Sequence, residues 1–122
     1  MKAKAREPES FLPLTAAMFQ ILLALADQER HGYSIMQEVE RGTGGKVRLG
    51  PGTLYGSVKR MLGDGLIAES DERPDAALDD ERRRYYRLTD LGRRVAVAEA
   101  ERLAELVSAA RAKKLLNRTQ AG

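Results

Sequence analysis

The segment from Pro51 to Leu62 has the pattern of a helix with two unlike faces. Four apolar residues recur at helical spacing and predict the side that packs on a core: Leu54, Val58, Met61 and Leu62. The other side is small, hydroxylated and basic, and it carries Thr53, Tyr55, Gly56, Ser57, Lys59 and Arg60. Proline at the start of the segment suits the first turn of a helix. Such a helix can rest on a core with one face and meet an external partner with the other.

The basic face of this helix indicates DNA as the partner. Between Lys46 and Leu62 the chain has four basic residues and no acidic one. Small residues let the backbone come close to the major groove, hydroxyls bond phosphates or bases, and cationic side chains neutralise phosphate charge. The net charge of the whole chain is only +3, so the local distribution carries the argument. We therefore predict that the residues of the basic face bind DNA.

Other classes of site are excluded or disfavoured by the composition. The chain has no cysteine, which excludes disulfides, thiol catalysis and cysteine-ligated zinc. Its one histidine, His31, precedes a predicted helix, where capping or packing is expected rather than acid–base catalysis. The acidic residues 79–81 are expected to be solvated or paired with the arginines that follow them. We therefore predict no catalytic residue, no cofactor and no metal site.

The sequence also lacks the features of a membrane or exported protein. No apolar run approaches the roughly 18 residues of a membrane span. The basic leader before the first apolar segment is short and contains Glu7, Pro8 and Glu9, which argues against a signal peptide. We predict a cytoplasmic protein that does not contact a membrane.

Apolar spacing predicts the remaining elements. We expect a flexible basic arm over residues 1–11, then a buried helix from Thr15, as its N-cap, to Ala26. A second helix is expected over 32–42, with an apolar side formed by Tyr33, Ile35, Met36 and Val39. Strands are expected at 66–70 and 82–88. Two strands after a third helix predict a mainly helical fold with a small β-hairpin, a winged helix-turn-helix over residues 12–89.

The long loop between the strands would form the wing. Strand alternation places Arg82 and Arg84 on one face and Arg83 on the other, so we predict that Arg82 and Arg84 contact DNA. Pairing with the neighbouring acids is the alternative. Since the tip of the loop is acidic, we expect the base of the wing to lie nearer the DNA.

A long helix is expected from Asp90 to about Leu116, within a C-terminal part that covers residues 90–122. An apolar stripe repeats along it at heptad spacing, which indicates a helix that meets another helix: Ala96, Ala100, Leu103, Val107 and Ala110, widened by Val95 and Leu106. We predict that the partner is the same helix of a second copy, which gives a two-fold dimer with a frayed basic tail. Packing of this helix on the chain's own domain is the alternative, and we expect its first turns, with Leu91 and Val95, to pack in that way.

Four motifs resemble the signature of the PadR family of bacterial transcriptional regulators, in order and over roughly residues 12–95: His31–Ile35, Gly50–Tyr55, Gly65–Ile67 and Arg83–Gly92. The single C-terminal helix is similar to the short subfamily. The resemblance implies a homodimeric repressor of its own and a neighbouring promoter, with Thr53, Tyr55 and Lys59 in the major groove. It also implies a small-molecule effector, which some short members stack on a tryptophan of the last helix. This chain has no tryptophan and departs from that pattern.

The leading hypothesis is therefore a dimeric, sequence-specific DNA-binding transcriptional regulator whose DNA site is an inverted repeat. A winged-helix adaptor that binds protein and no DNA is the alternative, because a fold does not dictate a function. A small-molecule carrier that uses the cleft between two copies is a third hypothesis.

Overall fold

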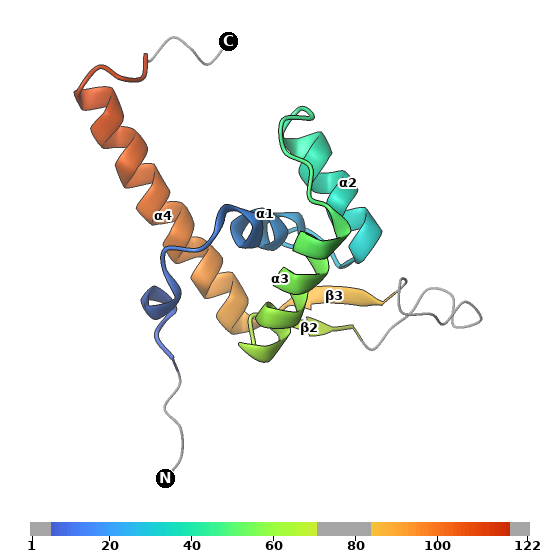
Figure 1. Cartoon of the computed structure of the whole chain (residues 1–122). Helices are drawn as coiled ribbons and strands as arrows, with labels where there is room; N and C mark the ends of the chain where they lie inside the picture. The colour runs from blue at the N-terminus through green and yellow to red at the C-terminus, as the bar shows by residue number, and fades with distance from the viewer. Residues whose placement is uncertain (1–5, 71–83, 118–122) are drawn as a thin grey trace.

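A computed structural model describes residues 6–70 and 84–117 of the chain, and Figure 1 shows it as mainly helical with a small sheet. In chain order, its elements are η1 (Pro8–Phe11), α1 (Ala16–Ala24), β1 (Arg30–His31), α2 (Gly32–Gly42), α3 (Pro51–Gly63), β2 (Ile67–Glu69), β3 (Tyr85–Leu88) and α4 (Asp90–Ala112). The order from α1 to β3 is that of a winged helix-turn-helix, and the long helix α4 follows it. The predicted fold class is confirmed.

The sheet has three antiparallel strands in the order β1-β3-β2. Tyr86 of β3 lies opposite Arg30 of β1 on one side and opposite Glu69 of β2 on the other. The sequence predicts only the two strands of the hairpin. Strand β1 is two residues long, which is too short to show an alternating pattern. Residues 71–83, with the tip of the wing, Arg82 and Arg83, lie outside the described residues.

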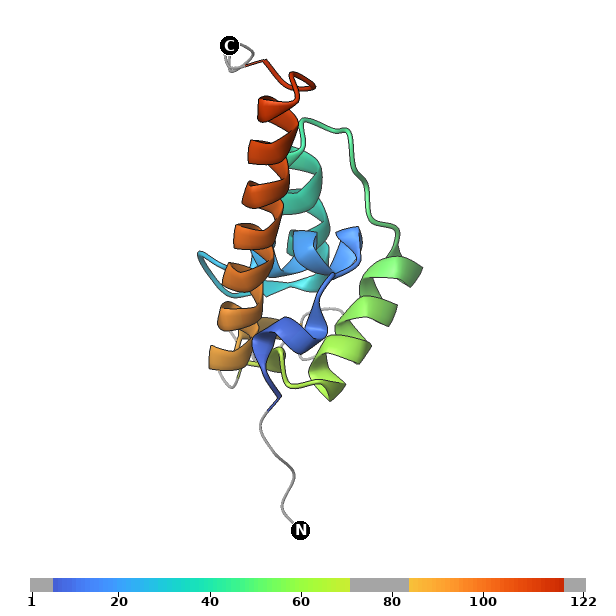
Figure 2. The ribbon, with the colours of Figure 1, turned by 90° about the vertical axis from the view of Figure 1, so that its left-hand side faces the viewer.

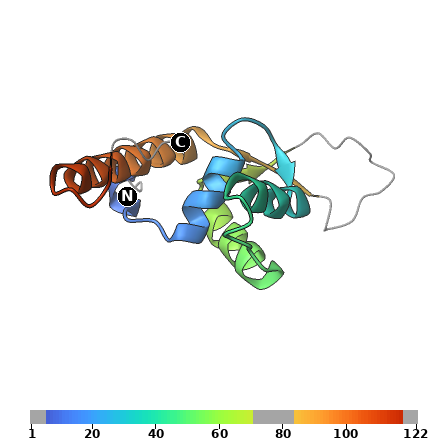
Figure 3. The same ribbon diagram turned by 90° about the horizontal axis from the view of Figure 1, so that it is seen from above.

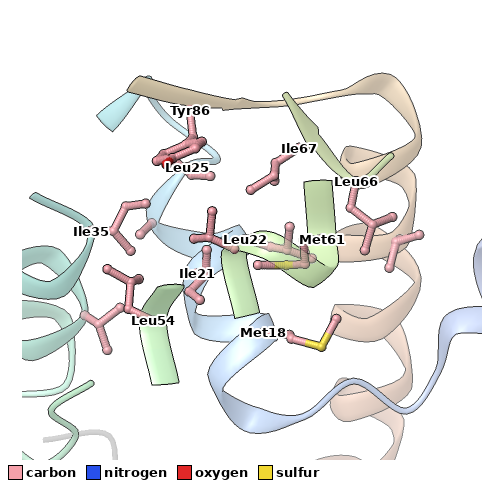
Figure 4. Packing of buried hydrophobic residues seen from close by; sticks show 14 residues of the cluster. Met18, Ile21, Leu22, Leu25, Ile35, Leu54, Met61, Leu66, Ile67 and Tyr86 are labelled. Carbon is pink, nitrogen blue, oxygen red and sulfur yellow. The ribbon is translucent and has the colours of Figure 1, made fainter. Parts of the chain in front are cut away.

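The core is centred on α1, which contacts α2, α3 and α4. Thr15 caps this helix as predicted, because its side chain accepts a hydrogen bond from the backbone N–H of Met18 at 3.1 Å. Side chains from the other helices and from the sheet converge on α1 in Figure 4. Its labelled residues are Met18, Ile21, Leu22, Leu25, Ile35, Leu54, Met61, Leu66, Ile67 and Tyr86, all buried. Burial of this apolar cluster is the main stabilising contribution to the fold.

Tyr33 differs from its predicted place on the apolar side of α2. Its side chain is 59% exposed, while Ile35 and Val39 of the same helix are buried. Tyr33 belongs to the first turn, where its ring stacks on that of His31 with the centroids 6.5 Å apart. The Tyr33 ring therefore packs on a neighbouring ring at the surface and not in the core.

Of the flexible arm predicted over residues 1–11, residues 1–5 lie outside the described residues, and the remainder contacts the domain. Pro8–Phe11 forms the 3-10 helix η1, which packs on α4. Phe11, Leu12 and Leu14 lie against the core, and the backbone N–H of Leu14 donates to a carboxylate oxygen of Glu99 at 3.0 Å. Apolar burial and this long-range hydrogen bond explain why the residues around η1 pack on the domain and do not extend into solvent as a flexible arm.

Helix α4 begins directly after Thr89, whose side chain accepts a hydrogen bond from the backbone N–H of Gly92. Its first turns are packed on the domain, and the rest extends beyond it, as the view from above shows (Figure 3). Val95 is fully buried. The helix ends at Ala112, four residues before the predicted end. None of the described helices combines the length and the apolar character needed to cross a bilayer.

Candidate nucleic-acid interface

Helix α3 is held by one face only. Leu54, Val58 and Met61 are buried against α1, α2 and β2, as the apolar spacing predicts. Pro51 provides the first helical turn after Gly50. The opposite face is open to solvent, and α3 lies at the edge of the molecule (Figure 3). The fold therefore presents this helix along its length.

The open face of α3 is basic. Thr53, Gly56, Lys59 and Arg60 are exposed, and Ser57 is half-buried. In the described parts of the chain, no carboxylate pairs with Lys59 or Arg60. By comparison, the arginines at positions 30, 41, 48 and 84 each have an acidic partner. The positive charge of α3 is thus available to an external anion.

Gly56 occupies the middle of this face. A methyl group added at its Cα would meet no atom within 4 Å. Glycine in the interior of a helix costs roughly 1 kcal/mol relative to alanine, and no contact among the described residues offsets that cost. What glycine provides here is an accessible backbone between Thr53 and Arg60.

Tyr55 is held against the neighbouring helix. It is half-buried at the edge of the core, and its ring lies on the backbone of Gly32 at the start of α2. A β-carbon added at Gly32 would overlap the hydroxyl of Tyr55 and lie 2.8 Å from its Cζ atom. Packing between α2 and α3 is therefore one role of Tyr55, in addition to the predicted contact with DNA.

We expect Tyr55→Ala to lower the free energy of unfolding by about 2 kcal/mol, because it removes a half-buried ring from the α2–α3 contact. Tyr55→Phe keeps the ring and should change that free energy by less than about 1 kcal/mol. Urea unfolding followed by circular dichroism measures both. Exposed Lys59→Ala is the control, with an expected change within about 0.5 kcal/mol. Parent-like stability of Tyr55→Ala would show that the ring does not support the packing.

At the base of the wing, the structure places a second basic group. Arg84 pairs with Glu69 of β2 at 3.0 Å. The acids of the pairing alternative, residues 79–81, lie outside the described residues. Arg87 of β3 is exposed, and it was not among the residues predicted to bind DNA. Because Tyr86 is buried, strand alternation turns Tyr85 and Arg87 to the outer face. If the sequence had shown which of the two tyrosines is buried, strand alternation would have predicted that Arg87 lies on the exposed face of β3.

His31 has a structural role at the start of α2. Its Nδ1 atom accepts a hydrogen bond from the backbone N–H of Ser34 at 3.2 Å, and this caps the helix. Its ring also contacts Tyr85 edge-on, with the centroids 5.3 Å apart. Within the described ranges, no group of three or more histidine, aspartate or glutamate residues is placed to hold a metal ion.

The predicted dimerisation stripe of α4 divides into two parts. Val95 lies in the monomer core and Ala96 packs against it, so Val95 is not available to a second copy. Leu106 is 55% exposed and Val107 is 39% exposed. Ala100 is also exposed, and Leu103 and Ala110 are half-buried. The stripe is therefore open from Ala100 onward, where α4 extends past its own domain.

Comparison with known proteins agrees with this architecture. Residues 21–98 match the family model of the transcriptional regulator PadR-like family. Transcriptional regulator Rv3488 of Mycobacterium tuberculosis is 37% identical over 91 residues, which are 75% of this chain and 78% of that protein. An uncharacterised 37.1 kDa protein in transposon TN4556 of Streptomyces fradiae is 37% identical over 90 residues, which cover 74% of this chain. The chain spans only 24% of that protein's length.

A solved structure shows the same fold. The crystal structure of a PadR family transcription regulator from hypervirulent Clostridium difficile R20291 superposes with a TM-score of 0.65 at 22% sequence identity. The superposition covers 80% of this chain and 96% of the other.

Proposed function

Since the chain belongs to the PadR-like family, whose members are transcriptional regulators and not enzymes, we propose that it is a dimeric, sequence-specific DNA-binding repressor. Its targets would be its own promoter and a neighbouring one. The open basic face of α3 is the observation that carries this proposal. Among the described residues, no carboxylate pairs with Lys59 or Arg60, and the backbone at Gly56 is accessible. A protein-binding adaptor has less need of such a face.

In this proposal α3 enters the major groove. Thr53, Gly56 and Arg60 follow one another at spacings of three and four, so they share one side of the helix. Hydroxyl and backbone groups would approach the bases, while Lys59 and Arg60 bind phosphates on either side. The exposed Arg87 and the Arg84–Glu69 pair would lie at the base of the wing, near the DNA backbone.

The exposed distal half of α4 supports the dimer. An apolar stripe in water is unfavourable, and the same stripe of a second copy would cover it with two-fold symmetry. Two α3 helices would then face one side of a duplex. We expect an inverted repeat with half-sites about 10 bp apart or a multiple of that spacing. A small-molecule effector that favours a different separation of the two α3 helices would release the DNA.

The test is binding to the DNA upstream of the gene, measured by fluorescence anisotropy over a series of salt concentrations. Each phosphate neutralised contributes about −0.9 to the log–log slope of affinity against salt. We expect Lys59→Ala and Arg60→Ala each to make that slope about 0.9 less steep per protomer bound. Arg111→Ala, at the distal end of α4 and far from α3 in Figure 1, is the matched control. It should keep the slope of the parent protein.

Equal slopes for the parent and both α3 variants would remove Lys59 and Arg60 from the phosphate contacts. Failure of the parent to retain any promoter fragment in dilute buffer would instead favour the adaptor. Tyr55→Phe, which keeps the packing on Gly32, tests base reading separately. If the hydroxyl reads bases, this variant weakens operator binding more than binding to random DNA.

A further inference from the structure

Glu99 is a buried carboxylate that DNA binding does not use. Its side chain is 2% exposed, and it lies on α4 directly before the part of that helix that extends past the domain. A buried charge is unfavourable unless it is paired and hydrogen-bonded. Glu99 meets both conditions, because Arg102 binds its two oxygens at 2.6 and 3.0 Å and the backbone N–H of Leu14 donates to it at 3.0 Å.

These contacts keep Glu99 ionised. The hydrogen bond from Arg102 lowers the pKa of the Glu99 carboxyl, and this effect outweighs burial, which acts in the opposite direction. The donor from Leu14 lowers the pKa further. A carboxylate in this state is a strong acceptor for a backbone N–H. The bond to Leu14 is therefore charge-assisted, and it joins segments 85 residues apart in the sequence.

The segment that Glu99 holds reaches the far end of α3. We call residues 6–14 the N-terminal brace. At its start, Arg6 lies 3.8 Å from the carboxylate of Asp64, the C-cap of α3, and the Arg6 guanidinium covers the ring of Phe11 at 4.0 Å. Between these ends, η1 packs on α4. Figure 2 shows the brace beside α4, on the side that faces the end of α3.

We propose that Glu99 is a positioning residue, which anchors the N-terminal brace on α4 and thereby sets the angle between α3 and α4. The inference rests on the proposed function, in which α4 joins two copies and α3 reads DNA. The angle between the two helices then determines how far apart the two α3 helices lie. Arg102 holds the Glu99 carboxylate in place, and the Arg6–Asp64 contact completes the brace at α3.

Hydrogen exchange of the Leu14 amide tests the anchor directly. We expect Glu99→Ala to exchange this amide at least about tenfold faster than the parent, with core amides such as that of Leu22 unchanged. Glu99→Gln keeps an acceptor oxygen and removes the charge, so its Leu14 amide should exchange at a rate between those of the parent and of Glu99→Ala. Glu101→Gln, an exposed glutamate on the same helix, is the matched control and should behave as the parent.

Spin labels test the angle between α3 and α4 within one chain, whether or not DNA or a second copy is bound. The chain has no cysteine, so Lys59→Cys and Ser108→Cys place one label on α3 and one on α4. Labelled chains diluted into excess unlabelled protein report only the distance within a chain. We expect Glu99→Ala, and to a smaller degree Glu99→Gln, to broaden or shift that distance distribution. If Glu99→Ala does not fold, the distance distribution of Glu99→Gln decides whether Glu99 sets the angle between α3 and α4.

The outcomes separate this inference from the proposed function. A parent-like distance distribution in a variant with fast Leu14 exchange would show that Glu99 anchors the brace and does not position α3. If the Leu14 amide of Glu99→Ala exchanged as slowly as that of the parent, Glu99 would not anchor the N-terminal brace. With DNA, Glu99→Ala should change the preferred spacing of the two half-sites and leave affinity for a single half-site within about twofold. Loss of all DNA binding by the parent would overturn the proposed function, whatever the two structural measurements show.

Discussion

Gly92→Ala is expected to lower the free energy of unfolding by about 3 kcal/mol or more, at the upper end of overpacking substitutions. A β-carbon at Gly92 would overlap the carbonyl oxygen of Leu66 and lie 2.8 Å from its carbonyl carbon. That carbonyl cannot move freely, since it accepts the backbone N–H of Thr89 at 3.1 Å. The greater helix propensity of alanine, worth roughly 1 kcal/mol, offsets only part of the loss. Thermal and urea unfolding measure the difference.

Gly56→Ala is the matched control for this prediction. It makes the same change inside a helix, but the new methyl group meets open space. We expect it to raise the free energy of unfolding by up to about 1 kcal/mol and to weaken DNA binding by blocking close approach. If Gly92→Ala were as stable as Gly56→Ala, the close contact between α4 and the backbone of Leu66 would not be present in solution.

Leu103→Asp combined with Val107→Asp is expected to give a monomer and to reduce affinity for a two-half-site operator by about a hundredfold or more. The two carboxylates would lie within the apolar stripe of α4 and would have to be desolvated against a second copy. Loss of the dimer removes the gain from binding two linked sites, which is typically about 10²–10⁴-fold. Light scattering measures the oligomeric state, and anisotropy on one- and two-half-site duplexes measures the affinity.

Ser108→Asp places one such carboxylate on an exposed residue of α4 outside the stripe and should leave both readouts unchanged. A double variant that remains dimeric would show that the stripe is not the interface. A monomer that binds both duplexes as the parent does would contradict the coupling between the dimer and operator recognition.

Two pairs of sequence motifs meet in the structure. The backbone of Gly32, in the first motif, lies against the ring of Tyr55, in the second. The backbone of Gly92, in the fourth motif, lies against the carbonyl of Leu66, in the third. Each glycine allows another element to approach its backbone closely. Parts of the motifs that carry the family resemblance therefore hold α2 to α3, and α4 to the residue that precedes β2. The positions proposed to face DNA, Thr53, Gly56, Lys59 and Arg60, belong to α3, which these contacts keep in place.

The sequence by itself determined the mainly helical winged fold, the buried and open faces of α3 and the cap at Thr15. These features follow from local spacing and from side chains that bond to nearby backbone groups, which are properties of short segments. Only the tertiary structure decided between the two roles predicted for Val95, and it placed that residue in the core. It also decided that β1 joins the sheet and that Tyr33 is exposed. It also revealed the Leu14–Glu99 hydrogen bond. Such features depend on contacts between distant segments, and periodicity within one segment carries no information about which distant residue will cover it.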